Sequence, residues 1–173
     1  MRSFKGARVY AGALLYFLLS RYNPFMKKFV SHSIKDTQDF AQLVLAEVQK
    51  KSRKGAIVLA LYGDLGSGKT TLVQEIGKLL GVIETMQSPT FVIMKLYDIS
   101  YKPFAKLIHI DAYRLEHADE LVHLGWNELI ADPKNLIALE WADRVKDLLP
   151  AGAIKICCKF VDDSTREFSA ASL

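Results

Sequence analysis

The chain has 173 residues, half of them hydrophobic and 24% charged, which is typical of a globular protein with one substantial core. Its formal net charge of +4 comes from the amino terminus, because residues 1–25 contain four basic residues and no acidic one. Residues 26–173 contain 19 basic and 19 acidic residues. The body of the chain is therefore neutral, and its net charge gives no support for a nucleic-acid-binding surface.

Residues 1–25 are expected to lie outside the fold. Their apolar stretch, residues 10–20, follows three basic residues and is far too short to cross a bilayer as a helix. We interpret residues 1–25 as an extension or a misplaced start, because Met26 would be a suitable first residue. A membrane-surface helix and a cleaved signal peptide are the alternatives. Residues 26–173 are expected to form a single domain that does not act at a membrane.

The first half of this domain predicts a helix, a buried strand and a second helix. The first helix is expected from Ser33 to about residue 51, because Ser33 and Asp36 have the spacing of a capping box. The apolar run AIVLALYG, residues 56–63, is typical of a strand that is buried on both faces. After a glycine-rich segment, apolar residues recur at helical spacing until Gly81, which predicts the second helix and its end.

The second half predicts mainly strands. Residues 90–99 and 106–111 are β-like, and the short connection between them favours an antiparallel pair. A helix-prone stretch covers residues 116 to about 130, and residues 135–141 are typical of another buried strand. Two further strands are expected near the carboxyl terminus. This order of elements favours an α/β sandwich.

The segment GDLGSGKTT, residues 63–71, matches the phosphate-binding pattern G-x-x-x-x-G-K-[ST] between a predicted strand and a predicted helix. Glycines allow the main chain to wrap a polyphosphate with inward-pointing N–H groups, and the following helix adds free N–H groups and its positive dipole end. Lys69 can reach the β and γ phosphates, and the Thr70 hydroxyl can bind Mg²⁺. The segment therefore predicts a P-loop that binds a nucleotide together with magnesium.

Two of the predicted strands end in carboxylates, Asp111 and Glu140. Ligands of open α/β sheets bind beyond the carboxyl ends of the strands, so both acids are expected to face the phosphates and to manage magnesium or water. An acid that caps the next helix is the alternative for each. His109 shares a strand face with Asp111 and is interpreted as a structural histidine. Trp141 is interpreted as a packing residue at the rim of the site.

Four motifs follow one another along the chain: GDLGSGKTT, QSPTF at residues 87–91, HIDAYRL at residues 109–115 and LEWADR at residues 139–144. Over about residues 33–160 they closely resemble the bacterial TsaE family of tRNA threonylcarbamoyladenosine biosynthesis ATPases, formerly called YjeE. The resemblance implies a P-loop NTPase-like three-layer α/β sandwich with a mixed, mostly parallel sheet and an antiparallel strand pair. Residues 1–25 have no counterpart in the family's pattern.

The resemblance also implies which residues act on the nucleotide. Thr70 and Glu140 match the Mg²⁺ ligands, and Asp111 matches an acid needed for turnover. Lys69, Asp111 and Glu140 are accordingly the expected catalytic residues. The residues that match the phosphate-holding segment are Gly63, Asp64, Leu65, Gly66, Ser67, Gly68, Lys69, Thr70 and Thr71.

Three further features carry over from the family. Thr37 lies where the family places a residue near the adenine. Trp141 matches a tryptophan beside the site. Ser88, Pro89 and Thr90 match a switch-like segment that responds to the state of the nucleotide.

The family's activity implies ATP and Mg²⁺ as cofactors and a place in the cytoplasm. It also implies two partner proteins, TsaD-like and TsaB-like, which modify position 37 of tRNAs reading codons that begin with A, so that tRNA is reached only through this complex. A small-molecule kinase is one alternative, although Arg114, Arg144 and Arg166 are too scattered for an arginine-rich lid. A nucleotide-sensing switch without appreciable turnover is another, and the paired acids argue against it.

Overall fold

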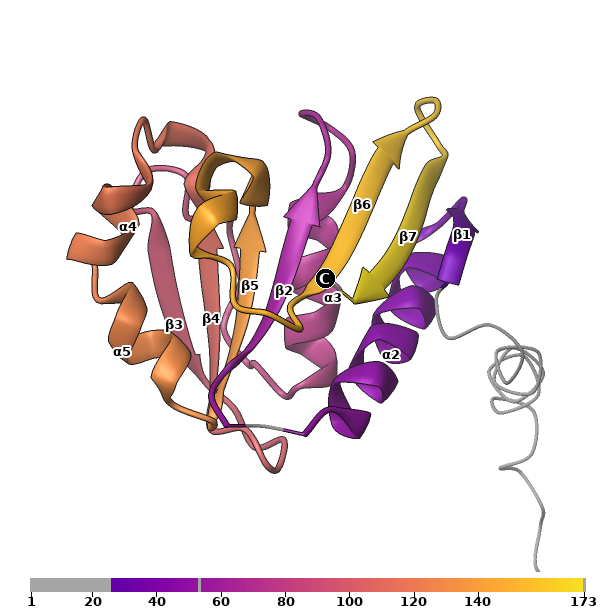
Figure 1. Cartoon of the computed structure of the whole chain (residues 1–173). Coiled ribbons are helices and arrows are strands. Elements are labelled where there is room, and N and C mark those ends of the chain that lie inside the picture. Colours follow the sequence, from indigo (N-terminus) through magenta and orange to yellow (C-terminus); the bar gives the residue numbers. More distant parts are fainter. Residues whose placement is uncertain (1–25, 53, 173) are drawn as a thin grey trace, which may run out of the picture.

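The computed structural model describes residues 26–52 and 54–172, so the expectation for residues 1–25 lies outside the described part of the chain. The described residues form one sheet with helices on both faces (Figure 1). Its strands are β1 (Met26–Ser31), β2 (Ile57–Tyr62), β3 (Met94–Asp98), β4 (Lys106–Asp111), β5 (Asn135–Glu140), β6 (Ile154–Phe160) and β7 (Arg166–Ser172). The helices are α2 (Ile34–Lys50), α3 (Lys69–Leu79), α4 (Ala118–His123) and α5 (Trp126–Ala131), with the 3₁₀ helices η2 (Ala112–Arg114) and η3 (Ala142–Leu148).

The strand order in the sheet is β1-β7-β6-β2-β5-β4-β3. Four neighbouring strands, β6, β2, β5 and β4, run parallel, whereas β1, β7 and β3 join the sheet by antiparallel pairing. The expected mixed, mostly parallel sheet and the antiparallel pair of β3 and β4 are therefore confirmed. The parallel strands point in one direction (Figure 1), so their carboxyl ends meet at one edge of the sheet.

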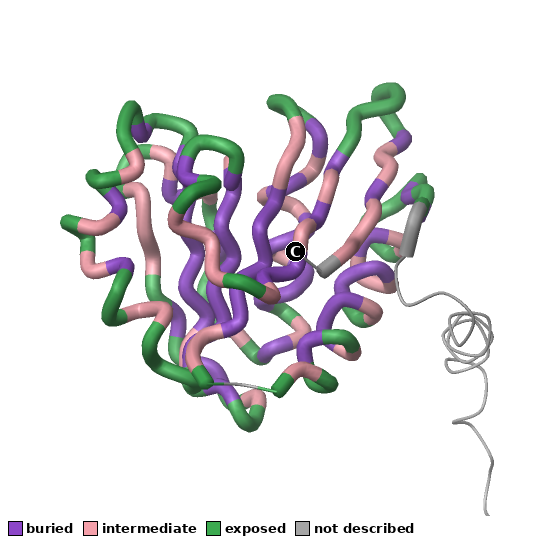
Figure 2. Tube along the Cα trace, viewed as in Figure 1, coloured by how far each residue is buried: buried purple, intermediate pink, exposed green. Residues whose placement is uncertain are grey.

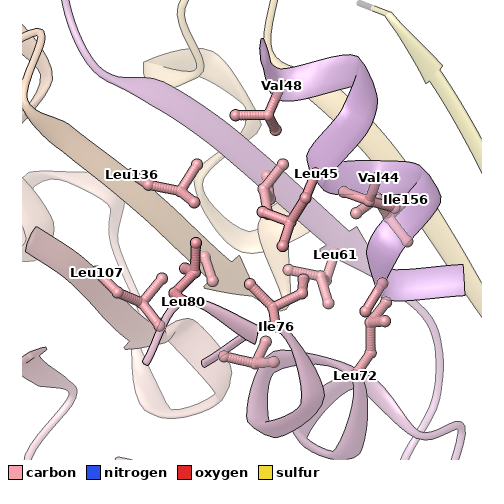
Figure 3. Packing of buried hydrophobic residues seen from close by; sticks show 14 of the residues in the cluster. Val44, Leu45, Val48, Leu61, Leu72, Ile76, Leu80, Leu107, Leu136 and Ile156 are labelled. Carbon is pink, nitrogen blue, oxygen red and sulfur yellow. The ribbon is translucent and has the colours of Figure 1, made fainter. Parts of the chain in front are cut away.

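Two apolar cores lie on opposite faces of this sheet, which makes the fold a three-layer sandwich. On one face, Val44 and Leu45 of α2 and Leu72 and Ile76 of α3 pack against Leu61 of β2 (Figure 3). The other face is covered by α4, α5 and η3. Because β2 and β5 lie between both layers, they are buried along their length (Figure 2). No helix in residues 26–52 or 54–172 has the length and apolar character needed to cross a membrane.

The helix α2 begins after the capping residue that the sequence predicts. The Ser33 hydroxyl accepts a hydrogen bond from the N–H of Asp36 at 3.1 Å. The Asp36 carboxylate in turn accepts the N–H of His32 at 2.9 Å, and this main-chain hydrogen bond lowers the pKa of Asp36. The two bonds together stabilise the first turn of the helix that lies beside the site.

The structure differs from the sequence-based expectations in three places. The strand β1 was not predicted, because its sequence MKKFVS alternates only weakly and pairs with a single neighbour, β7. Residues 90–93 were wrongly expected in a strand: they form a turn in which the N–H of Ile93 donates to the oxygen of Pro89 at 2.6 Å. The helix-prone stretch over residues 116 to about 130 is confirmed as helical but is divided into two helices, since Gly125 has a φ of 88° and separates α4 from α5.

Candidate functional site

The glycine-rich segment, residues 63–71, connects the end of β2 to α3. Gly63 has a φ of +136°, and a Cβ atom there would lie 2.0 Å from the main-chain oxygen of Cys158 in β6. Both the conformation and the close approach of β6 therefore require glycine. Gly68, with a φ of 93°, turns the chain into α3. The neighbouring strand thus fixes the start of the segment, and the helix fixes its end.

The main chain of this segment leaves several N–H groups available. The N–H of Ser67 donates to the oxygen of Asp64 at 3.2 Å, whereas those of Gly66, Gly68 and Lys69 have no hydrogen-bond partner among the described residues. The Ser67 hydroxyl is also buried without a partner in the described part of the chain. These donors lie at the positive dipole end of α3, so the segment can hold an anion such as a phosphate.

Lys69 begins α3 and turns its side chain back toward the segment. Its Nζ donates to the main-chain oxygens of Gly63 and Asp64, at 2.7 and 2.8 Å, and lies 4.0 Å from the centre of the Trp141 ring. Burial lowers the pKa of Lys69, and the nearby charge of Glu140 partly opposes this shift. A bound phosphate would add negative charge at the same place and would favour the charged ammonium group.

Glu140, at the end of β5, divides its two carboxylate oxygens between two partners. Its Oε2 accepts the Thr70 hydroxyl of α3 at 2.9 Å, and its Oε1 lies 2.7 Å from Nε2 of His109 in β4. Glu140 itself is only 2% exposed. The next residue, Trp141, has a φ of 57°, which is uncommon for a bulky side chain. This turn directly after the acid is the place where the Trp141 ring covers Lys69.

The oxygens of Thr70 and Glu140 have the spacing of two neighbouring ligands of one Mg²⁺ ion. Octahedral Mg²⁺ holds its ligands at about 2.1 Å, so adjacent ligand oxygens lie roughly 3 Å apart. The separation of Thr70 Oγ1 and Glu140 Oε2 is 2.9 Å. No group of three His, Cys, Asp or Glu side chains within the described residues is arranged to hold a metal. A magnesium ion at Thr70 and Glu140 would therefore take its other ligands from water and from phosphate oxygens.

Asp111, at the end of β4, is bonded to the segment that leads into β3 (residues 88–93). Its Oδ2 accepts the Ser88 hydroxyl at 2.8 Å and the Thr90 hydroxyl at 2.6 Å. Its Oδ1 accepts the N–H of Tyr113 at 3.0 Å, so Asp111 also caps η2. The capping role weighed for both acids is thus seen for Asp111, whereas Glu140 does not cap η3, which begins after Trp141 without a side-chain cap.

These groups line one cavity of about 750 Å³ at the carboxyl edge of the parallel strands. At its α2 side, the Thr37 hydroxyl lies 2.9 Å from the Ser31 hydroxyl and donates to the oxygen of Ser33 at 3.3 Å. Gly63 and Asp64 do not line the cavity, but their main-chain oxygens accept hydrogen bonds from the Lys69 ammonium group. The singled-out residues that do line it are Thr37, Leu65, Gly66, Ser67, Gly68, Lys69, Thr70, Thr71, Ser88, Thr90, Asp111, Glu140 and Trp141.

The β6–β7 hairpin contributes a part of the cavity that was not predicted from the sequence. Arg166 of β7 donates from Nε to the oxygen of Gly66 at 2.8 Å, and it lines the cavity. Its guanidinium group also packs over the Phe160 ring, 4.6 Å from the ring centre. No local pattern indicates this contact, because Arg166 lies 100 residues after the glycine it contacts.

The three layers, the glycine-rich segment between β2 and α3 and the strand-end acids define a P-loop NTPase-type protein. Within that class, the family described as Threonylcarbamoyl adenosine biosynthesis protein TsaE matches residues 31–168. The chain belongs to this TsaE family, which confirms the resemblance seen in the four motifs.

Individual relatives agree with this assignment. A Rickettsia bellii protein named tRNA threonylcarbamoyladenosine biosynthesis protein TsaE is 33% identical over 138 residues, which are 79% of this chain and 89% of that protein. A Bacillus subtilis protein of the same name is 35% identical over 125 residues, 72% of this chain and 75% of its own length. The crystal structure of Bacillus subtilis YdiB has a TM-score of 0.60 and 28% identity, and the match covers 84% of each chain.

Proposed function

We propose that this protein is a Mg²⁺-dependent ATPase required for threonylcarbamoyladenosine formation at position 37 of tRNAs that read codons beginning with A. The observation that carries the proposal is the 2.9 Å hydrogen bond between Thr70 and Glu140 beside the available N–H groups of the P-loop. A hydroxyl and a carboxylate at this spacing, next to an anion-binding main chain, suit a triphosphate with its magnesium ion. Membership of the TsaE family supports the link to tRNA modification.

In this proposal, different residues of the cavity bind the phosphates, the Mg²⁺ ion and the adenine of ATP. Residues 63–71 hold the phosphates, and Lys69 leaves the oxygens of Gly63 and Asp64 to contact the β and γ phosphates. Thr70 and Glu140 would hold the Mg²⁺ ion, which would supply positive charge to the phosphate oxygens. Thr37 lines the α2 side of the cavity and would lie near the adenine.

Asp111 is the acid proposed to be required for turnover. Its hydrogen bonds to Ser88 and Thr90 join it to the segment of residues 88–93, so a change at the phosphates can be passed to that segment. The segment would then respond to the state of the nucleotide, as a switch does. The Trp141 ring covers Lys69 and would limit the access of water to this side of the cavity.

We further propose that the protein acts in the cytoplasm with a TsaD-like and a TsaB-like partner. It would contact tRNA only through these partners and would not act at a membrane. The Rickettsia bellii and Bacillus subtilis relatives are named as tRNA threonylcarbamoyladenosine biosynthesis proteins, which supports this assembly. The chemistry of threonylcarbamoyl transfer would then belong to the partner complex.

A reconstituted tRNA-modification assay tests the activity and the partnership together. Purified TsaD-like and TsaB-like proteins, tRNA, threonylcarbamoyl donor and ATP are incubated with and without this protein, and modified nucleoside and released phosphate are both measured. We expect slow ATP hydrolysis by the protein alone, faster hydrolysis with the partners, and sustained modification only in the complete mixture.

Two results would favour the alternatives. Phosphorylation of an added sugar or nucleoside, in step with ATP consumption, would indicate a small-molecule kinase. Full support of modification by a variant that binds ATP without hydrolysing it would indicate a nucleotide-sensing switch.

A further inference from the structure

His109 is a fully buried imidazole in β4 with one hydrogen-bond partner. Its exposed fraction is 0%, and its Nε2 lies 2.7 Å from Glu140 Oε1. The other ring nitrogen, Nδ1, is buried and has no partner among the described residues. A buried N–H without a partner is unfavourable, so we assign the proton of the neutral ring to Nε2, which donates to Glu140.

We propose that His109 is a positioning residue that holds Oε1 of Glu140 inside the protein and thereby directs Oε2 to Thr70 and the cation. This inference deepens the proposed function and rests on it. It goes beyond the structural role that the sequence suggested for His109, because a histidine that only filled the core would not need to contact a metal-binding carboxylate.

The register of the sheet explains how the two side chains meet. In the parallel pair of β4 and β5, His109 is opposite Ala138, and Asp111 is opposite Glu140. Residues two apart on a strand share a face, so His109 lies on the same face as Glu140. The small side chain of Ala138 leaves space through which the imidazole reaches along β5 to the carboxylate.

On its core side, this contact lies against apolar side chains. Leu107 and Leu136, two residues before His109 and Ala138, are buried in the core beneath α2 and α3 (Figure 3). A polar side chain at position 109 therefore has to be compensated by a hydrogen bond, and among the described residues that bond goes to Glu140 alone.

His109 would affect cation binding because it fixes which carboxylate oxygen of Glu140 faces the cation. Without the His109 N–H, Oε1 of Glu140 would be buried without a partner, and the carboxylate could rotate so that either oxygen faced Thr70. Outer hydrogen bonds that fix a ligand typically change metal affinity by about 10- to 100-fold. His109 should therefore affect magnesium binding and leave the phosphate cradle, which is made of main-chain groups, unaffected.

Calorimetric titration of ADP into the full-length protein, in EDTA and in excess Mg²⁺, tests this proposal with two matched variants. His109→Leu removes the donor, whereas His109→Gln keeps an N–H donor at a similar reach. We expect the leucine variant to bind ADP in EDTA within about twofold of wild type and to lose about tenfold or more of the strengthening that Mg²⁺ gives. The glutamine variant should recover most of that strengthening. Titration of Mn²⁺ into the ADP-bound proteins, followed by electron paramagnetic resonance, should rank the Mn²⁺ affinities in the same order, with the leucine variant weakest.

Other outcomes overturn the inference in distinguishable ways. Equal losses of ADP affinity with and without Mg²⁺ would mean that His109 supports only the fold, and unchanged Mg²⁺ strengthening in the leucine variant would mean that it positions nothing. If the leucine variant does not fold, His109→Asn gives the same comparison, because its amide is too short to reach Glu140. Wild-type protein that bound ADP equally well with and without Mg²⁺ would overturn the proposed function, and this inference with it.

Discussion

Glu140 and Asp111 end neighbouring parallel strands at the same level of the sheet, yet they have different partners. They are opposite each other in the pairing of β5 with β4, and their exposed fractions are 2% and 3%. Glu140 contacts the P-loop helix through Thr70. Asp111 contacts the segment of residues 88–93 through Ser88 and Thr90.

The difference shows that a strand-end position does not fix the role of an acid. The strand β5 is next to β2, which leads into the P-loop, and Leu61 of β2 is opposite Glu140. The strand β4 is one place further from β2, and its end is covered by the segment that enters β3. Neighbouring strands lie about 4.8 Å apart, so one place in the sheet is enough to give Glu140 a partner in α3 and Asp111 its partners in residues 88–93.

Lys69→Ala removes the cation of the site that contains both strand-end acids, and it should have the largest effect. We expect ATP hydrolysis to fall by about 10²- to 10³-fold, because the charge that contacts the β and γ phosphates is lost. Phosphate release, with ADP affinity measured in parallel, checks this result. Lys54→Ala, at an exposed lysine before β2, is the matched control, and unchanged turnover in Lys69→Ala would rule out this site.

Glu140 is the strand-end acid that contacts Thr70 beside the P-loop. Glu140→Gln keeps the shape of this side chain and removes its charge. We expect the Mg²⁺ concentration needed for half-maximal ATP hydrolysis to rise by about 10- to 100-fold. A magnesium titration of the steady-state rate measures this shift. A loss of stability with unchanged magnesium dependence would instead identify Glu140 as a structural residue.

Asp111→Asn makes the same change at the other strand end and should separate the two acids. The amide is not an acid and cannot accept hydrogen bonds at both former oxygens, so we expect hydrolysis to fall by at least about tenfold, the minimum that weakening one or two hydrogen bonds to a charged group would cause. Its magnesium dependence should stay close to that of wild type. An equal rise in the magnesium requirement for both variants would show that the two acids bind the ion together.

Thr90→Val should give the smallest effect, because it removes one hydroxyl from Asp111 and leaves that of Ser88 in place. We expect a loss of about 1 kcal/mol in the free energy of unfolding, measured with urea, and faster amide hydrogen exchange in residues 88–93. The Mg²⁺-dependent affinity for ADP should not change. Ser88→Ala is the matched variant for the other hydroxyl, and slower exchange in either variant would contradict the assigned hydrogen bonds.

Much of the fold could be predicted because its signals are local. Continuous apolar runs indicated β2 and β5, and helical spacing up to Gly81 indicated α3. Where a signal was weak, the expectation failed: β1 has little alternation, and the turn at residues 90–93 depends on Ile93 adopting a φ of 65°, which β-branched residues rarely do. Gly125 did carry a signal for the break between α4 and α5, since glycine favours the left-handed conformation.

The sequence by itself determined the phosphate-binding segment, its flanking strand and helix and the family, because these depend on residues that are contiguous or occur in ordered motifs. Only the tertiary structure decided that Asp111 holds Ser88 and Thr90, that His109 holds Glu140, and that Arg166 contacts Gly66. The reason is physical: these contacts join residues from different strands and loops, and strand order and register set their distances. A local pattern can state which chemical groups are available, but the sheet decides which of them meet.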